Sequence, residues 1–242
     1  GLEWDGVERI DRWLIEYAGA EDNEFNRAVG ALWLTAAVKR VREPGCKFDE
    51  MLVFEQNEGT DKSTALETLA GGPDFFSDGL PLGADPKLTI ELTSGKWIIE
   101  AAELAGLKSG TKNYHVNKAW LSRRVDTARA AYGRFPIDVK RQFVVAGTTN
   151  HAEYLDDPTG NRRFWPVRIV KFDVAALRRD RDQIWAEAQA REASGASIRL
   201  DPSLWATAAE AQAERRIDHP WAEAIAAQLP EGDIRVFTED LW

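Results

Sequence analysis

The sequence predicts an α/β fold built around a phosphate-binding loop (P-loop), and three apolar segments carry this prediction. Residues 51–54 form an apolar run, which a polar loop and a Lys-Ser-Thr helix start follow. A second apolar run, residues 97–99, ends on a carboxylate, and a third segment, residues 141–150, ends in Thr-Thr-Asn. Short apolar runs bounded by turn or helix signals are typical of buried strands.

Length and composition exclude several classes of protein. A chain of 242 residues with 44% hydrophobic residues and ten Trp can bury a large core and is not disordered. The net charge of −9 argues against a uniformly basic nucleic-acid-binding coat. Cys46 is the one cysteine, which excludes a disulfide framework and a cysteine zinc site.

Targeting signals are also missing from the sequence. No apolar run approaches the length of about 20 residues that a membrane span needs, so we expect no membrane partner. The first 15 residues carry four carboxylates and do not form a signal peptide, which favours the cytoplasm. The chain ends abruptly on Leu241-Trp242, and we expect it to be part of a longer protein.

Apolar residues predict helices at both ends of the chain. Residues 7–42 repeat them at helical spacing before Pro44-Gly45, and residues 173–229 do so again. We therefore predict an N-terminal helical segment (1–47), a core (48–172) and a C-terminal helical segment (173–242). A strand and a helix start near residues 235–241 fit the beginning of a winged-helix domain.

The loop after the first strand departs from the P-loop pattern G-x-x-x-x-G-K-[ST] at both glycines. Gln56 and Asp61 occupy these positions, while Lys62 and Ser63 match the pattern. A side chain where the loop needs positive φ costs roughly 1–2 kcal/mol. A carboxylate about 4 Å from a phosphate is repelled by about 4 kcal/mol at an effective dielectric near 20, and by about 1 in solvent. The alternative is an ordinary helix start capped by Asp61 or Thr60.

Polar groups follow the second and third predicted strands. Glu100 and Glu103 come after the second, where a P-loop protein has its Walker B acids. Asn150 ends the third strand, and an amide there can bond a terminal phosphate or its water; the alternative is a simple Asn turn. The adjacent Arg162 and Arg163 then precede an apolar strand and fit an arginine finger, although a surface salt bridge would explain one of them equally well.

Residues 108–141 stand apart in charge, with nine basic and two acidic residues, a net charge of +7 against −16 for the rest of the chain. Such asymmetry favours an anionic partner such as nucleic acid, and the interleaved Tyr114, Trp120 and Tyr132 fit base stacking. The alternative is a solvated helix whose basic residues pair with acids on neighbouring subunits.

These motifs together resemble the virulence-associated E family, phage- and plasmid-linked proteins with a P-loop ATPase core similar to superfamily III helicases and primase-helicases. The resemblance covers roughly residues 10–200. The segments that carry it are residues 58–64, 95–104, 124–134, 147–150, 159–167 and 180–188.

The resemblance implies a P-loop NTPase fold of AAA+-like, superfamily III helicase-like type: a three-layer core with helical N- and C-terminal segments. It implies ATP and Mg²⁺ as cofactors, DNA as a partner and assembly into a homo-oligomeric ring, for instance a hexamer. The implied function is an ATP-dependent, helicase-like ATPase of mobile-element replication. The alternatives are a non-hydrolysing relative that binds DNA or protein, with Asp61 closing the phosphate site, and a scaffold whose arginines bind acidic partners.

The implied roles fall on matching residues of this sequence. The nucleotide-binding residues are Glu58, Gly59, Thr60, Asp61, Lys62, Ser63 and Thr64. Ser63 and Glu100 would hold the metal, Glu100 and Glu103 are the catalytic acids, Asn150 is the sensor, and Arg162 or Arg163 is a finger reaching a neighbour's nucleotide. The nucleic-acid contacts are Lys112, Lys118, Arg123, Arg124, Arg129 and Arg134.

Overall fold

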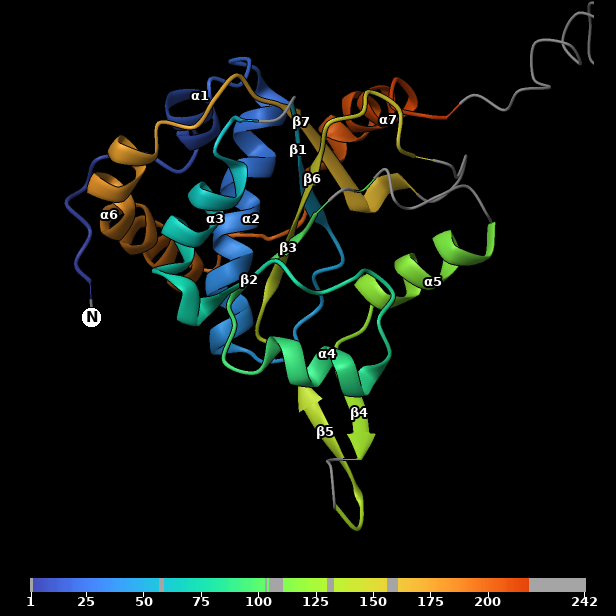
Figure 1. The fold of residues 1–242 in the computed structure, drawn as a ribbon. Coiled ribbons are helices and arrows are strands. Elements are labelled where there is room, and N and C mark those ends of the chain that lie inside the picture. The colour runs from blue at the N-terminus through green and yellow to red at the C-terminus, as the bar shows by residue number, and fades with distance from the viewer. Residues whose placement is uncertain are drawn as a thin grey trace, which may run out of the picture.

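A parallel β-sheet forms the centre of the protein (Figure 1). The computed structural model describes residues 2–56, 59–102, 104, 111–129, 133–155 and 161–217, with the backbone alone at 111–114. Within these residues, five strands pair in the order β2–β3–β6–β1–β7, all parallel. The strands are β1 (Met51–Glu55), β2 (Phe76–Ser77), β3 (Ile98–Ala101), β6 (Val144–Thr149) and β7 (Phe164–Arg168).

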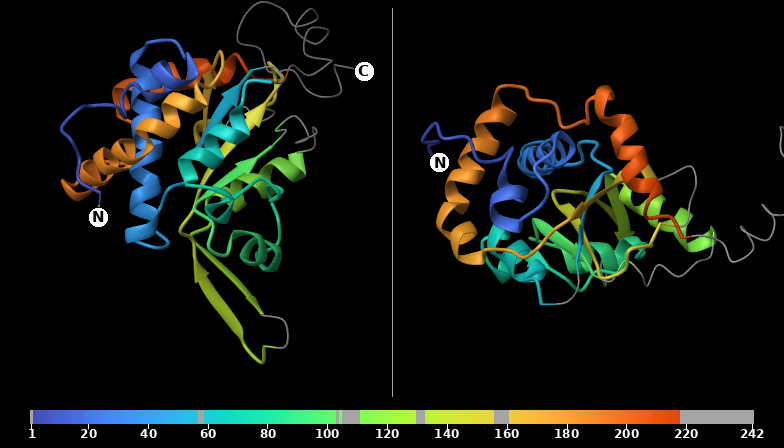
Figure 2. Two further views of the ribbon diagram at one scale, coloured as in Figure 1. Left: turned by 60° about the vertical axis from the view of Figure 1, so that its left-hand side comes forward. Right: turned by 90° about the horizontal axis from the view of Figure 1, so that it is seen from above.

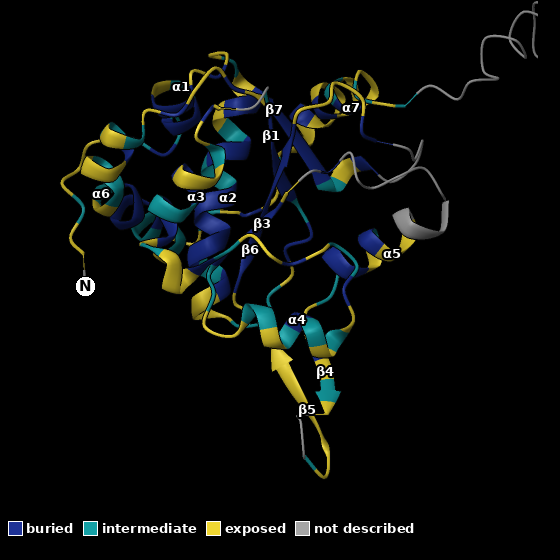
Figure 3. Cartoon of the chain, in the orientation of Figure 1, coloured by how far each residue is buried: buried dark blue, intermediate teal, exposed yellow. Residues whose placement is uncertain are grey.

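The central strands are buried (Figure 3). Alternate residues of β1 enter two different cores, one on each face of the sheet. Leu52 and Phe54 of β1 belong to the larger core, whereas Met51 and Val53 belong to the smaller one. This alternation follows from the two-residue period of a strand. It also explains why these strands read as continuous apolar runs in the sequence.

Four helices supply most of the helical residues described in the larger core and cover that face of the sheet (Figure 2). They are α1 (Trp13–Ala18), α2 (Glu24–Arg42), α3 (Lys62–Ala70) and α6 (Val174–Ala193). The predicted helical stretch at 7–42 divides in two because Gly19 ends α1 in the left-handed region, at φ 66°. Asn23 then starts α2, since its side chain accepts a hydrogen bond from the Asn26 amide.

The smaller core lies on the opposite face, under α4 (Pro86–Thr93) and α5 (Thr111–Leu121). Asp85 caps α4 at the Leu88 amide, and Pro86 occupies the first helical position. Trp120 of α5 is fully buried and donates its indole N–H to Thr89. The expectation that Trp120 stacks on bases is therefore wrong. Tyr132 and the side chain of Tyr114 lie outside the described residues.

An antiparallel hairpin projects from the body below the sheet (Figures 1 and 2). It consists of β4 (Val125–Arg129) and β5 (Pro136–Lys140), and all five residues of β5 are exposed. The root of the hairpin is a buried ion pair, in which Arg141 Nε and Nη2 donate to the two Asp126 oxygens at 2.6 and 2.9 Å. The basic segment thus contains a helix and a hairpin, so a solvated helix describes only part of it, and pairing with acids on neighbouring subunits stays a prediction.

Short elements complete the described chain. The 3₁₀ turns are η1 (Pro73–Phe75), η3 (Asn161–Arg163) and η4 (Pro202–Leu204). Helix α7 (Trp205–Ala213) packs beside the edge strand β7, where Gln212 donates to the Phe164 carbonyl at 2.9 Å. The strand and helix start expected near residues 235–241 lie outside the described residues, and the domain boundaries at 47/48 and 172/173 stay predictions. Among the described helices, none has the length and apolar character that a bilayer crossing requires.

Candidate functional site at the carboxyl ends of the parallel strands

The loop between β1 and α3 adopts a strained backbone where the P-loop pattern has glycine. Asp61 has φ 60°, the left-handed region, and is the one non-glycine residue with positive φ in the described part of the chain. Gly59 also has positive φ, at 79°. The strain expected at Asp61, roughly 1–2 kcal/mol, is therefore present. A strained residue that persists next to a helix N-terminus is typical of ligand-binding loops.

The Asp61 carboxylate does not cap helix α3. It stands at the N-cap position of α3 but makes no side-chain cap hydrogen bond, so its interpretation as an ordinary cap is wrong. Its Oδ2 instead lies 3.4 Å from Lys171 Nζ, in an ion pair whose two side chains are exposed. Lys171 thereby offsets part of the negative charge that the sequence places beside the loop.

Lys62 is held between the loop and the tip of β6. Its Nζ donates to the Gln56 carbonyl at 2.6 Å and to Asn150 Oδ1 at 3.1 Å. The register brings these groups together, because Glu55 of β1 pairs with Thr149 of β6. Gln56, the other position where the pattern has glycine, uses its side-chain amide to bond the Ile169 carbonyl at 2.8 Å.

Ser63 meets Glu100 at the tip of the next strand. Ser63 Oγ donates to Glu100 Oε1 at 3.0 Å, and Thr148 Oγ1 donates to the same oxygen at 2.8 Å. Thr148 is a site residue whose role the sequence analysis missed, although it lies in the Thr-Thr-Asn strand end. The side chains of Lys62, Ser63, Glu100 and Asn150 thus meet at the carboxyl ends of β1, β6 and β3, where parallel α/β sheets bind ligands.

Glu100 has the surroundings of a metal ligand. It is 2% exposed, and its Oε2 is buried without a hydrogen-bond partner among the described residues. An unpaired buried carboxylate oxygen beside a serine hydroxyl fits Mg²⁺, which uses one or two protein oxygens together with water and substrate phosphate. No group of three or more His, Cys, Asp or Glu side chains suited to a metal occurs within the described ranges, so a metal caged by protein alone is not indicated there.

The other predicted loop residues lie at or near this site. Gly59 belongs to the loop, the Thr60 carbonyl accepts a bond from the Phe172 amide at 3.1 Å, and Thr64 is exposed in the first turn of α3. Glu58 and Glu103 lie outside the described residues.

Arg162 and Arg163 lie near the amino ends of the strands, at the end of the sheet opposite to Lys62. They belong to η3, directly before β7, and Phe164 pairs with Met51 at the amino end of β1. Arg163 bonds Ser122 Oγ at 3.0 Å within its own chain, whereas Arg162 is exposed. Neither arginine joins the site of Lys62 in one copy of the chain.

The residues predicted to contact nucleic acid differ in their exposure and in the hydrogen bonds that they make within the chain. Arg124 donates to the Gly45 carbonyl and Arg123 to the Ala84 carbonyl, and both bonds tie the root of the hairpin to the body. Arg129 and Arg134 are exposed farther along the hairpin. Lys118 is half-buried on α5, and the side chain of Lys112 is not among those described.

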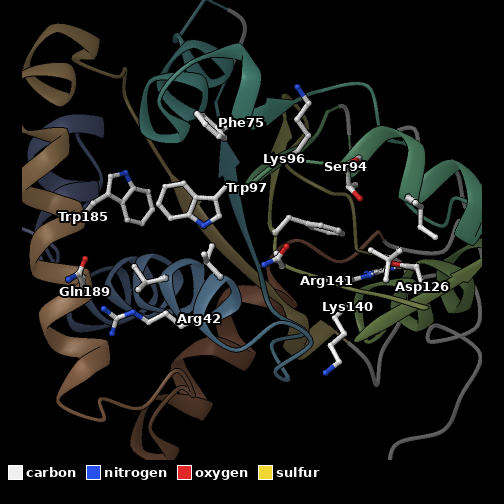
Figure 4. Close-up of a pocket in the computed structure, with 18 of the residues that line it drawn as sticks. Arg42, Phe75, Ser94, Lys96, Trp97, Asp126, Lys140, Arg141, Trp185 and Gln189 are labelled. Atoms are coloured by element: carbon white, nitrogen blue, oxygen red, sulfur yellow. Dashed lines mark hydrogen bonds and ion pairs between the residues drawn. The ribbon is translucent and has the colours of Figure 1, made fainter. Parts of the chain in front are cut away.

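A separate hollow of about 770 Å³ opens at the amino ends of β3 and β6 (Figure 4). The ring centroids of Trp97 and Trp185 lie 4.2 Å apart in its wall, and the paired Asp126 and Arg141 lie on its opposite side. It is mostly apolar, lies at the far end of the strands from Lys62 and contains no residue of the loop. The polar groups around Lys62 and this hollow therefore lie at different ends of the sheet.

Two solved structures of the C-terminal region of NrS-1, both apo, have a related fold. One has a TM-score of 0.54 at 12% identity and covers 93% of this chain and 52% of that chain. The other has a TM-score of 0.51 at 14% identity, with coverages of 93% and 53%. The chain therefore spans about half the length of these NrS-1 chains, and at such identities the likeness concerns the fold alone. No curated protein matches the chain.

Family membership rests on a separate comparison. The family model described as the virulence-associated protein E-like domain matches residues 1–217, which is most of the chain. This match confirms the family that the sequence motifs predict. The chain belongs to the virulence-associated protein E-like family.

Proposed function

We propose that the chain is a P-loop ATPase that binds Mg-ATP at the carboxyl ends of β1, β6 and β3. The observation that carries this proposal is the convergence of Lys62, Ser63, Glu100 and Asn150 from one loop, one helix start and two strand tips. The start of α3 offers backbone N–H groups to an anion. Lys62, which donates to the Gln56 carbonyl, would neutralise phosphate oxygens, and the Ser63 hydroxyl would serve as a metal ligand.

The residues divide the chemistry between them. Magnesium, when bound, neutralises the charge that develops on the phosphates during transfer. Ser63 and Glu100 would hold it, because the buried Oε2 of Glu100 has no hydrogen-bond partner among the described residues and could serve as a ligand. Asn150 orients the attacking water or the terminal phosphate from the tip of β6. Glu103 is the second candidate for the acid that polarises this water.

The arginine finger and the DNA contact both require partners. Arg162 lies near the amino ends of the strands in its own chain, so a finger role requires the site of an adjacent copy, and we propose a homo-oligomeric ring for this reason. Arg129 and Arg134 on the projecting hairpin would contact DNA phosphates. Family membership supports a role in phage or plasmid replication.

We expect phosphate release from Mg-ATP by the intact chain, raised by single-stranded DNA. The measurement is a phosphate-release assay with and without magnesium and DNA, over a salt series. A double charge reversal, Arg129→Glu with Arg134→Glu, should remove the DNA stimulation and leave the DNA-independent rate, because both side chains lie on the hairpin and not at the phosphate loop. Stimulation that survives this reversal would exclude the hairpin as the contact.

The alternative is a non-hydrolysing relative that binds DNA or protein. The observation that favours it is Asp61, a carboxylate where the pattern has glycine. Nucleotide binding without hydrolysis at any DNA concentration would contradict the ATPase proposal, and no nucleotide binding at all would favour this alternative.

Replacing Asp61 by glycine is expected to tighten Mg-ATP binding about fivefold, because one solvent-screened charge repulsion is about 1 kcal/mol. Lys171→Ala should weaken binding in the wild-type chain, since Asp61 loses its counter-charge, but not in the Asp61→Gly chain. Calorimetric titration of the wild-type chain, the two single variants and the double variant with Mg-ATP measures this double-mutant cycle. Weaker binding by Asp61→Gly would show that the carboxylate does not oppose the phosphates.

A further inference from the structure

A largely buried bidentate ion pair joins the end of β1 to Arg215, two residues beyond the end of α7. Arg215 Nε donates to Glu55 Oε1 at 2.8 Å, and Arg215 Nη2 donates to Glu55 Oε2 at 3.0 Å. The side chains are 11% and 8% exposed. Tyr154, itself buried, adds a hydroxyl bond to Glu55 Oε1 at 2.7 Å. Burial alone would lower the pKa of Arg215, but the hydrogen bond and charge of Glu55, together with Tyr154 and Glu214, raise this pKa.

The main chain of Arg215 holds a second segment of the site. Its carbonyl accepts from the amides of Tyr154 and Leu155 at 3.0 and 2.9 Å, in the segment that follows Asn150. The Ile217 amide returns a bond to the Leu155 carbonyl at 2.9 Å. One residue therefore fixes both the end of β1 and the chain beyond the tip of β6.

These two segments supply the groups that hold Lys62. Glu55 directly precedes Gln56, whose carbonyl accepts from Lys62, and Asn150 supplies the other acceptor. A displacement of either segment moves an acceptor of the lysine. Arg215 itself is engaged by Glu55, Glu214 and the Ala211 carbonyl, so it acts on the site through other residues.

We propose that Arg215 is a positioning residue of the nucleotide site, which sets the place of the P-loop through Glu55 and the place of the Asn150 loop through its own carbonyl. This inference rests on the proposed nucleotide binding.

The test compares Arg215→Met, Glu55→Gln and the double variant with Arg191→Met. Arg191 is a matched control, since it also pairs with a buried glutamate, Glu187, at 2.6 Å, but lies on α6. We call the Arg215–Glu55 ion pair, together with the bonds of the Arg215 carbonyl to Tyr154 and Leu155, the clamp. Calorimetric titration with Mg-ATP should give a Kd about tenfold weaker for Arg215→Met and for Glu55→Gln, as expected when a coupled contact network is broken. Arg191→Met should lower the melting temperature and leave the Kd unchanged.

The double variant separates positioning from general stability. It removes both charges, so the melting temperature should recover toward the wild-type value while the Kd stays weak. A Kd that recovers together with the melting temperature would overturn the proposal, and so would single variants that bind as wild type does. Arg215→Lys, which keeps the charge but not the bidentate geometry, should give an intermediate Kd.

A nucleotide-free measurement distinguishes failure of this inference from failure of the proposed function. Hydrogen exchange should rise at residues 51–56 and 148–155 in Arg215→Met and not in Arg191→Met. Raised exchange in a chain that binds no Mg-ATP would refute the nucleotide site, and the positioning role with it, while keeping the structural clamp. Unchanged exchange at both segments would refute the clamp itself.

Discussion

Replacing Lys62 by alanine is expected to weaken Mg-ATP binding by about a hundredfold and to abolish phosphate release. The side chain supplies the positive charge at the start of α3 and lies between the Gln56 carbonyl and Asn150. Loss of a charge-assisted contact of roughly 3 kcal/mol corresponds to about that factor in Kd. Calorimetric titration and a phosphate-release assay measure the two effects.

Lys87→Ala is the matched control for this experiment. Lys87 lies on α4, is exposed and pairs at 3.8 Å with Glu91, so it shares the chemistry of Lys62 but not its place. The melting temperature should change little in either variant, because alanine suits both helices. Equal Kd values for Lys62→Ala and wild type would mean that phosphates do not bind at this loop.

The central strands were predictable because their chemistry is local. An apolar run bounded by polar residues predicts a buried strand, and the runs beginning near Met51, Trp97 and Phe143 fall on β1, β3 and β6. The positive φ at Asp61 followed from a pattern position that needs glycine. The order of the strands was not accessible, because pairing between distant segments leaves no periodicity in either one.

The hairpin was missed for a different physical reason. Ile137 and Val139 alternate with Asp138 and Lys140 in β5, but this run is short and its residues are exposed. The basic residues around it were interpreted as an interaction face instead. The burial of Arg141 also escaped the sequence analysis, because a charged residue enters the interior only when a partner such as Asp126 is there. Glu55 gave one usable signal, since an acid ending a fully apolar strand requires a partner.

Glu100→Gln is expected to change activity and stability in opposite directions. The amide should reduce magnesium-dependent phosphate release by about 10²–10³-fold, the range for removing one preorganised charge-stabilising group. It should also raise the free energy of unfolding of the nucleotide-free chain, because Glu100 is buried and has no ion-pair partner among the described residues. The gain comes from removing a buried charge that lacks an ion-pair partner, since the amide leaves an N–H₂ group in place of the unpaired oxygen. We expect roughly 1 kcal/mol, which is about 2–4 °C in melting temperature for a domain of this size.

The hydrogen bonds of Glu100 to two hydroxyl groups should be kept in Glu100→Gln. Ser63 and Thr148 both donate to Oε1, and the carbonyl oxygen of glutamine accepts the same two bonds. Glu91→Gln, at an exposed position on α4, is the matched control and should change neither quantity. A lower melting temperature for Glu100→Gln with unchanged phosphate release would assign the carboxylate to the fold alone. The expected pair of opposite changes would instead mean that the chain keeps a destabilising buried charge because the metal requires it.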